Sequence, residues 1–142
     1  MRLAAAAAIL CGVAVAVQAT FTGVMQRHVG TVESTFITYF SGGVVIGLVI
    51  LLLRGGNLGA APGMPWYVYT AGLFGLIIIG TLSLSVGELG LVPALVLITV
   101  SQFVVGALIN HFGLLGATVD PIDLGKVAGL ALLGIGTYLV LR

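Results

Sequence analysis

The sequence predicts an all-α integral membrane protein with five transmembrane helices, assembled as an antiparallel homodimer. Of its residues, 60% are hydrophobic and only 6% are charged, whereas an average soluble domain has about 25% charged residues. So few charges cannot cover a water-facing surface. The apolar residues fall in five runs of about the 20 residues that a helix needs to cross the hydrocarbon core. The charges that flank these runs are nearly balanced between the two membrane sides.

The five runs are separated by charged residues, glycine or proline. The first precedes residues 26–28, and the second precedes the loop that begins at Arg54. The third opens at 66–69 with aromatic residues, which favour the lipid–water interface. Breaks at 87–90 and 120–123 define the last two. The runs do not alternate apolar and polar residues as barrel strands do, so we expect helices. They cover residues 3–25, 34–53, 66–85, 91–110 and 124–141 within a single transmembrane domain of residues 1–142.

The composition also excludes several functions. A formal net charge of +1 provides no basic face for nucleic acid. The single cysteine, Cys11, excludes an intrachain disulfide and a cysteine-based zinc site. We find no nucleophile–base group, phosphate loop or metal-ligand cluster, so we expect no enzyme activity, cofactor or metal. The alanine-rich N-terminal segment also has an alternative interpretation. It could be a signal peptide that is cleaved near Ala16.

The distribution of basic residues favours insertion in both orientations. Arg2, Arg54 and Lys126 lie on one predicted side of the membrane, and Arg27 and Arg142 on the other. An excess of one barely orients a chain, because orientation depends on such a bias near the span ends. Two inverted copies of a five-helix chain would reproduce the inverted repeats of many secondary transporters. A single orientation imposed by lipid or a partner is the alternative.

Glycine spacing predicts close packing of helices within a copy or between copies. The chain has 22 glycines, more than its loops need. Gly43 and Gly47, and likewise Gly125 and Gly129, have the spacing that lets two membrane helices approach closely. Gly134 extends the smooth surface of the last helix.

Polar residues inside the predicted spans are the candidates for function. A carboxamide in hydrocarbon needs a partner or costs several kcal/mol, so each must face a helix or a wet cavity. Hydrogen bonds between helices, worth about 0.6 kcal/mol each, are one interpretation, and a substrate site near the membrane midplane is the other. The candidate substrate-binding residues are Gln18, Thr22, Tyr39, Ser41, Thr99, Ser101, Gln102 and Asn110.

The sequence resembles the YdcZ-like proteins, half-length members of the drug/metabolite transporter superfamily that act as inner-membrane exporters. The likeness covers nearly the whole chain. The matching positions are Val17-Gln18, Gly42-Gly43, Pro65-Trp66-Tyr67 with Gly72 and Gly75, Gly90 with Ser101-Gln102, and His111-Phe112-Gly113. The chain departs from the family pattern at Thr22, where members often carry Asn, and at Asn110, where they often carry an acid.

The resemblance implies a five-helix protomer of the bacterial inner membrane, an inverted dimer and movement of a small molecule. It supplies no substrate. Because Asn110 stands where family members often carry an acid, this chain lacks a carboxylate that could have taken part in proton coupling. No acidic or basic side chain lies deep in any predicted span.

The leading hypothesis is a transporter that works by alternating access. Two inverted copies would enclose a cavity lined by Gln18, Thr22, Ser101 and Gln102, suited to a neutral polar or amphipathic aromatic solute. One alternative is a passive channel built from the same dimer, with the polar stripe from Thr99 to Asn110 along a wet path. A second is a non-transporting membrane subunit.

Overall fold

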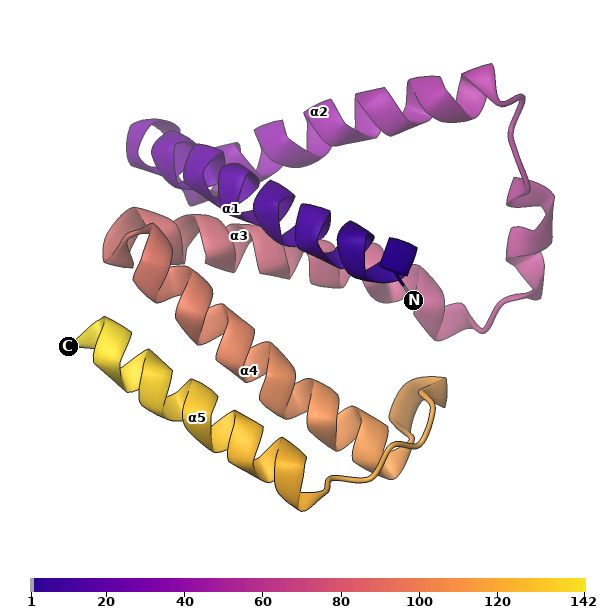
Figure 1. Ribbon diagram of the computed structural model, residues 1–142. Coiled ribbons are helices and arrows are strands. Elements are labelled where there is room, and N and C mark those ends of the chain that lie inside the picture. The colour runs from indigo at the N-terminus through magenta and orange to yellow at the C-terminus, as the bar shows by residue number, and fades with distance from the viewer. Residues whose placement is uncertain (1) are drawn as a thin grey trace. The chain divides into compact units, whose positions relative to one another are not determined.

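The described residues, 2–142, form five long α-helices and three short 3₁₀-helices in a computed structural model (Figure 1). Side chains are described for residues 3–142. The elements are α1 (Arg2–Val29), α2 (Thr31–Leu52), η1 (Leu58–Gly63), η2 (Trp66–Thr70), α3 (Ala71–Leu89), α4 (Leu91–Phe112), η3 (Leu114–Gly116) and α5 (Leu124–Leu141). In these residues five helices are long and apolar enough to cross a membrane. The predicted all-α class with five spans is confirmed.

The first helical boundary differs from the prediction. Arg27 and His28 belong to the last turn of α1 instead of a loop. The Arg27 cation there is favourable because it faces the negative end of the helix dipole, and His28 Nδ1 donates to the Val24 carbonyl at 2.9 Å. Gly30 alone then makes the turn, with φ +96°, a conformation that glycine adopts without strain. The second helix therefore begins at Thr31.

The remaining boundaries differ by small amounts. The aromatic residues at 66–70 form the separate 3₁₀-helix η2, after which α3 continues to Leu89. Helix α4 extends to Phe112, and Gly113 ends it in the left-handed conformation. Helix α5 has the predicted bounds. Asp123 caps it, because its Oδ1 accepts the Lys126 N–H at 2.8 Å.

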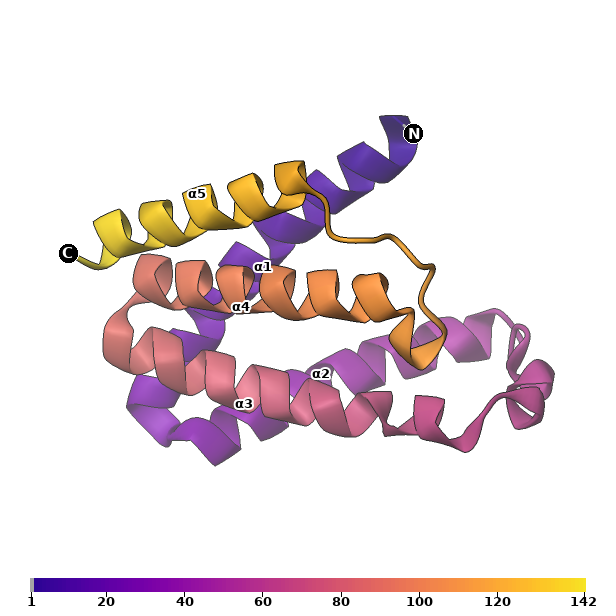
Figure 2. The same ribbon diagram turned by 90° about the horizontal axis from the view of Figure 1, so that it is seen from below.

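The chain forms two compact units, Met1–Glu88 (the N-terminal unit) and Leu89–Arg142 (the C-terminal unit). In the N-terminal unit, α1 and α2 meet at Gly30 and diverge from it in both views (Figures 1 and 2). Helix α3 packs against α1 where Gly23 faces Val86 so closely that an added Cβ would overlap the Val86 side chain. The small residue at that position sets the approach of the two helices.

A buried polar cluster links the three helices of the N-terminal unit. Ser34 Oγ and Ser83 Oγ are 2.7 Å apart, and Ser83 Oγ lies 3.1 Å from the Thr22 carbonyl as donor. Ser34 Oγ also lies 3.0 Å from the Thr31 carbonyl. Ser34 and Ser83 are completely buried. Hydroxyls in lipid-embedded helices can bond across helices in this way.

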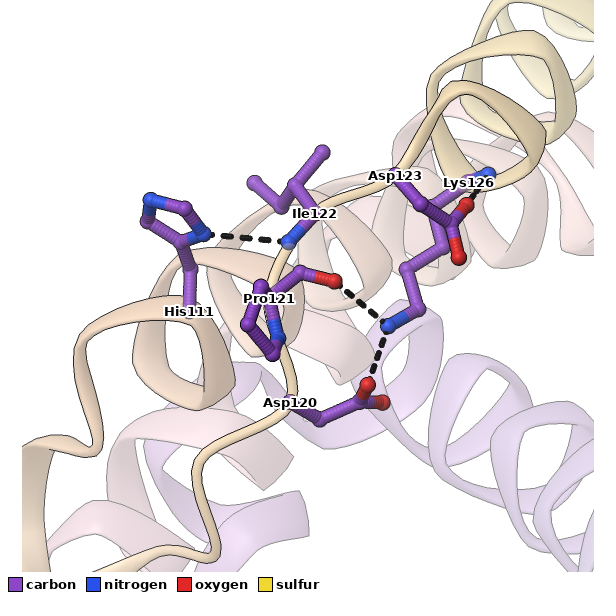
Figure 3. A network of polar contacts seen from close by, with 6 residues as sticks. All are labelled: His111, Asp120, Pro121, Ile122, Asp123 and Lys126. Atoms are coloured by element: carbon purple, nitrogen blue, oxygen red, sulfur yellow. Dashed lines mark hydrogen bonds and ion pairs between the residues drawn. The ribbon is translucent and has the colours of Figure 1, made fainter.

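In the C-terminal unit, α4 and α5 lie side by side and antiparallel in both views (Figures 1 and 2). The loop between them is held against the end of α4. The Asp120 N–H donates to the Asn110 carbonyl at 2.9 Å. The Ile122 N–H donates to His111 Nδ1 at 3.0 Å (Figure 3). These bonds fix where α5 begins relative to α4.

Candidate substrate cavities

Gln18 lies on the wall of a cavity of about 510 Å³ in the N-terminal unit, which we call the Gln18 cavity. Tyr39 and Thr38 of α2 line it together with Ile79 of α3. Tyr39 reaches this position because its hydroxyl lies directly above Gly75, where any side chain would overlap it. Two of the predicted site residues, from different helices, therefore share one cavity.

Gln102 and Asn110 lie on the wall of a cavity of about 400 Å³ between α4 and α5, which we call the Gln102 cavity. Gly106, midway between them, lines it as well. Residues four apart lie on one face of a helix, and this spacing places both carboxamide-bearing residues on the same side of α4. The floor is formed by apolar residues of α5, including Leu130 and Leu133.

Both glutamine side chains are chemically available to a solute. Among the residues whose side chains are described, neither Gln18 nor Gln102 forms a side-chain hydrogen bond, and both are exposed in the isolated chain. A carboxamide offers two donors and a carbonyl acceptor. Both cavities have volumes within the range of small-molecule sites, about 300–1,000 Å³.

Two residues that sequence reasoning missed lie at the mouth of the Gln102 cavity. Lys126 pairs through Nζ with the Asp120 carboxylate and also donates to the Pro121 carbonyl at 2.8 Å (Figure 3). The two side chains are 34% and 60% exposed, so water can reach them. As an ion pair these two lining side chains carry no net charge together, and Asp123 is not among the lining residues. The Asp123 cap three residues before Lys126 is the sequence signal that locates this helix start.

Thr99 lines a third cavity, of about 580 Å³, also between α4 and α5, which we call the Thr99 cavity. Apart from Thr99 and Tyr39, the three remaining hydroxyl-bearing candidates lie away from the walls of these three cavities. Thr22 is 1% exposed, and its hydroxyl donates to the Ala19 carbonyl at 3.1 Å. Ser41 and Ser101 are exposed, and each donates to a carbonyl three residues earlier in its own helix.

Two of the five predicted packing glycines line cavities, and four of the five have open space where a Cβ would lie. Gly43 lines the Gln18 cavity, and Gly129 lines both cavities between α4 and α5. Gly47 and Gly134 have open space where a Cβ would lie, and Gly125 faces the Asp123 carboxylate. Their role in contacts between copies stays a prediction.

Five apolar helices with solute-sized cavities and available carboxamides are typical of a multi-pass transporter of small molecules. A family model described as "Putative inner membrane exporter, YdcZ" matches residues 3–139, and the chain belongs to this family. No curated protein and no solved structure matches this chain. The resemblance found in the sequence is confirmed. The protein is a multi-pass inner-membrane transporter that lies in lipid and carries a small molecule, and its family is one of exporters, not of enzymes.

Proposed function

We propose that the protein exports a small molecule by alternating access across an antiparallel, dual-topology homodimer. The main support is that Gln18 and Gln102 line cavities, and that neither side chain forms a hydrogen bond among the described side chains. Amides that served only to hold helices together would be paired, because an unpaired amide in hydrocarbon is costly. The unpaired carboxamides of Gln18 and Gln102 therefore support contact with a polar solute.

The exposed apolar surface of a single copy supports the proposed homodimer. Large apolar side chains of every long helix are exposed, and Gly47 and Gly134 offer open backbone surface. An odd number of spans places the ends of each copy on opposite membrane sides, so inverted pairing gives two equivalent halves. We propose that each copy contributes one transmembrane domain to this dimer.

The link between the two units provides a place for movement. Gly90 is the one residue between α3 and α4, and its φ is +89°. No heavy atom lies within 4 Å of where its Cβ would be, outside its immediate chain neighbours and local helix backbone. Hinges are a few terminal residues that absorb backbone rotation. We propose that the units rock about Gly90 to alternate access to the cavities.

A continuous wet channel is not favoured by the lining of the cavities. The Gln102 cavity carries both carboxamides of α4, but the neighbouring Thr99 cavity is lined mainly by apolar residues such as Leu95 and Val140. A conducting path needs polar or charged groups along its length. The change in lining favours a carrier.

Uptake into proteoliposomes tests the site. With a panel of labelled neutral polar and amphiphilic solutes, Gln18→Ala and Gln102→Ala should each lower the initial counterflow rate about two- to tenfold. Each change removes a hydrogen bond worth about 0.5–1.5 kcal/mol. Asn57→Ala, which removes a carboxamide from the α2–α3 loop, is the matched control and should not change the rate. Full activity of both glutamine variants, with the dimer intact, would show the site assignment to be wrong.

Cysteine labelling tests the inverted dimer. In a Cys11→Ala background, Asn57→Cys and Glu88→Cys place single thiols on opposite sides of the membrane by the order of the spans. Under dual insertion an impermeant maleimide applied outside the cell labels about half of each variant. Complete labelling of one variant and none of the other would establish a single orientation.

A further inference from the structure

The two cavities between α4 and α5 adjoin. Gly129 and Leu133 line both the Gln102 cavity and the Thr99 cavity. We call the combined space the α4–α5 groove. Between Lys126 at one end and Val140 at the other, α5 rises about 21 Å at roughly 1.5 Å per residue. The groove thus follows most of the apolar thickness of one membrane, about 30 Å.

The chemistry of the α4–α5 groove changes from one end to the other. At the Lys126 end the walls hold two carboxamide side chains and the Lys126–Asp120 ion pair. At the Val140 end the polar side chains are Thr99 and Thr137, and the Thr137 hydroxyl is already bonded to the Leu133 carbonyl at 2.7 Å. A ligand that fills the groove must therefore be polar at one end and apolar along the rest.

The two charged side chains that line the polar end, Lys126 and Asp120, have no net charge together. Lys126 is neutralised by Asp120, and Gln102 and Asn110 are neutral donors and acceptors. A head group with a single net charge would find no counter-ion that is free of its own partner. A zwitterionic or uncharged head can use both donors and acceptors, and both members of the ion pair, without leaving a buried charge unpaired.

We propose that the α4–α5 groove binds a single-chain amphiphile whose polar head has no net charge. The head lies between Gln102 and Lys126, and the aliphatic chain follows Gly129 and Gly136 toward Val140. The missing side chains of Gly129 and Gly136, both with open space above them, leave room for that chain. The proposal rests on the proposed function, because it assigns the substrate class of the Gln102 cavity.

Photo-crosslinking of the full chain in lipid nanodiscs tests this. The probe is an alkyl phosphocholine with a diazirine at the chain end, and the modified residues are mapped by mass spectrometry. We expect modification to concentrate near Val140. Unlabelled alkyl phosphocholine should compete about tenfold better than matched alkyl sulfate or alkyl trimethylammonium, a difference of about 1.4 kcal/mol.

Two variants separate the groove from general lipid contact. Gly136→Leu fills the apolar half and should lower chain-end labelling about tenfold, equivalent to about 1.4 kcal/mol. Ala131→Leu adds similar bulk to an exposed position of α5 that is not among the groove-lining residues, and should leave labelling unchanged. Labelling spread evenly over the apolar faces of α1 and α2, or equal competition by all three heads, would overturn the proposal. Finding a two-chain phospholipid, or a second copy of the protein, bound in the groove would also overturn the proposal.

The labelling result is independent of transport. If the groove is labelled as expected but no solute is taken up by proteoliposomes, the binding inference stands and the proposed transport fails. If uptake depends on Gln18 and Gln102 while the groove remains unlabelled, the amphiphile inference fails and the transport proposal stands.

Discussion

The buried cluster of Ser34 and Ser83 allows a stability prediction from proton counting. The two hydroxyls make three contacts, to each other and to the Thr22 and Thr31 carbonyls. Each hydroxyl has one proton to donate, so at most two of the three contacts are hydrogen bonds at once. In Ser83→Ala, Ser34 still donates to Thr31 within its own helix, and one bond between helices is lost.

The expected cost follows from this count. A hydrogen bond between membrane helices contributes about 0.6 kcal/mol on average and up to about 1.7 kcal/mol, so Ser83→Ala should lower the unfolding free energy by that amount. Ser34→Ala should cost less, because Ser83 still donates to the Thr22 carbonyl across helices, and the double variant should cost about as much as Ser83→Ala, because its further loss is a bond within α2. Ser41→Ala, whose hydroxyl bonds only to Thr38 of its own helix, should change stability little.

Reversible unfolding in mixed micelles, with dodecyl sulfate as the denaturant and far-ultraviolet circular dichroism as the signal, measures these free energies. If Ser83→Ala is as stable as Ser41→Ala, the cluster does not hold α1, α2 and α3 together. A double variant that costs clearly more than Ser83→Ala would show that the cluster holds more than one bond between helices.

Two further substitutions test packing and capping by the same unfolding assay. Gly23→Ala should destabilise by up to about 2 kcal/mol, because overpacking against Val86 costs about 1–3 kcal/mol and helix propensity returns about 1 kcal/mol. Gly12→Ala, on an open face of the same helix, should not destabilise, and equal losses in the two variants would contradict the packing. Asp123→Ala should cost about 1 kcal/mol by removing the cap on the Lys126 N–H, and Asp123→Asn should retain most of it. Equal losses in Asp123→Ala and Asp123→Asn would contradict the cap.

The sequence predicted the helices well because length and hydropathy are sufficient to define a membrane span. It placed the end of the first helix too early, because the polar residues Gln26, Arg27 and His28 are typical of a break between apolar runs. Arg27 and His28 instead complete the last turn, where the charge of Arg27 is favourable. The turn at Gly30 occupies one residue, which hydropathy alone cannot reveal because it depends on a positive φ.

The candidate site was predictable only in part. Spacing along a helix correctly groups Gln102 with Asn110, but it does not say which stripe faces a neighbouring helix. Thr22 shares a predicted face with Gln18, yet it is buried and its hydroxyl bonds to its own helix. Hydroxyls can satisfy themselves on the preceding turn, whereas carboxamides in these positions remain available. The sequence places Asp120 at the groove mouth only in a loop. Its ion pair with Lys126 cannot be predicted from the sequence, because it depends on how that loop folds.

The proposed function requires that polar solute and water reach the two carboxamide positions inside the membrane. In a Cys11→Ala background, Gln18→Cys, Gln102→Cys and Val45→Cys place a thiol on each cavity wall and on an exposed apolar face of α2. Because reaction requires the thiolate, a water-soluble methanethiosulfonate should modify the first two variants about tenfold faster than the third. Equal, slow modification of all three in membranes that retain the folded dimer would contradict it.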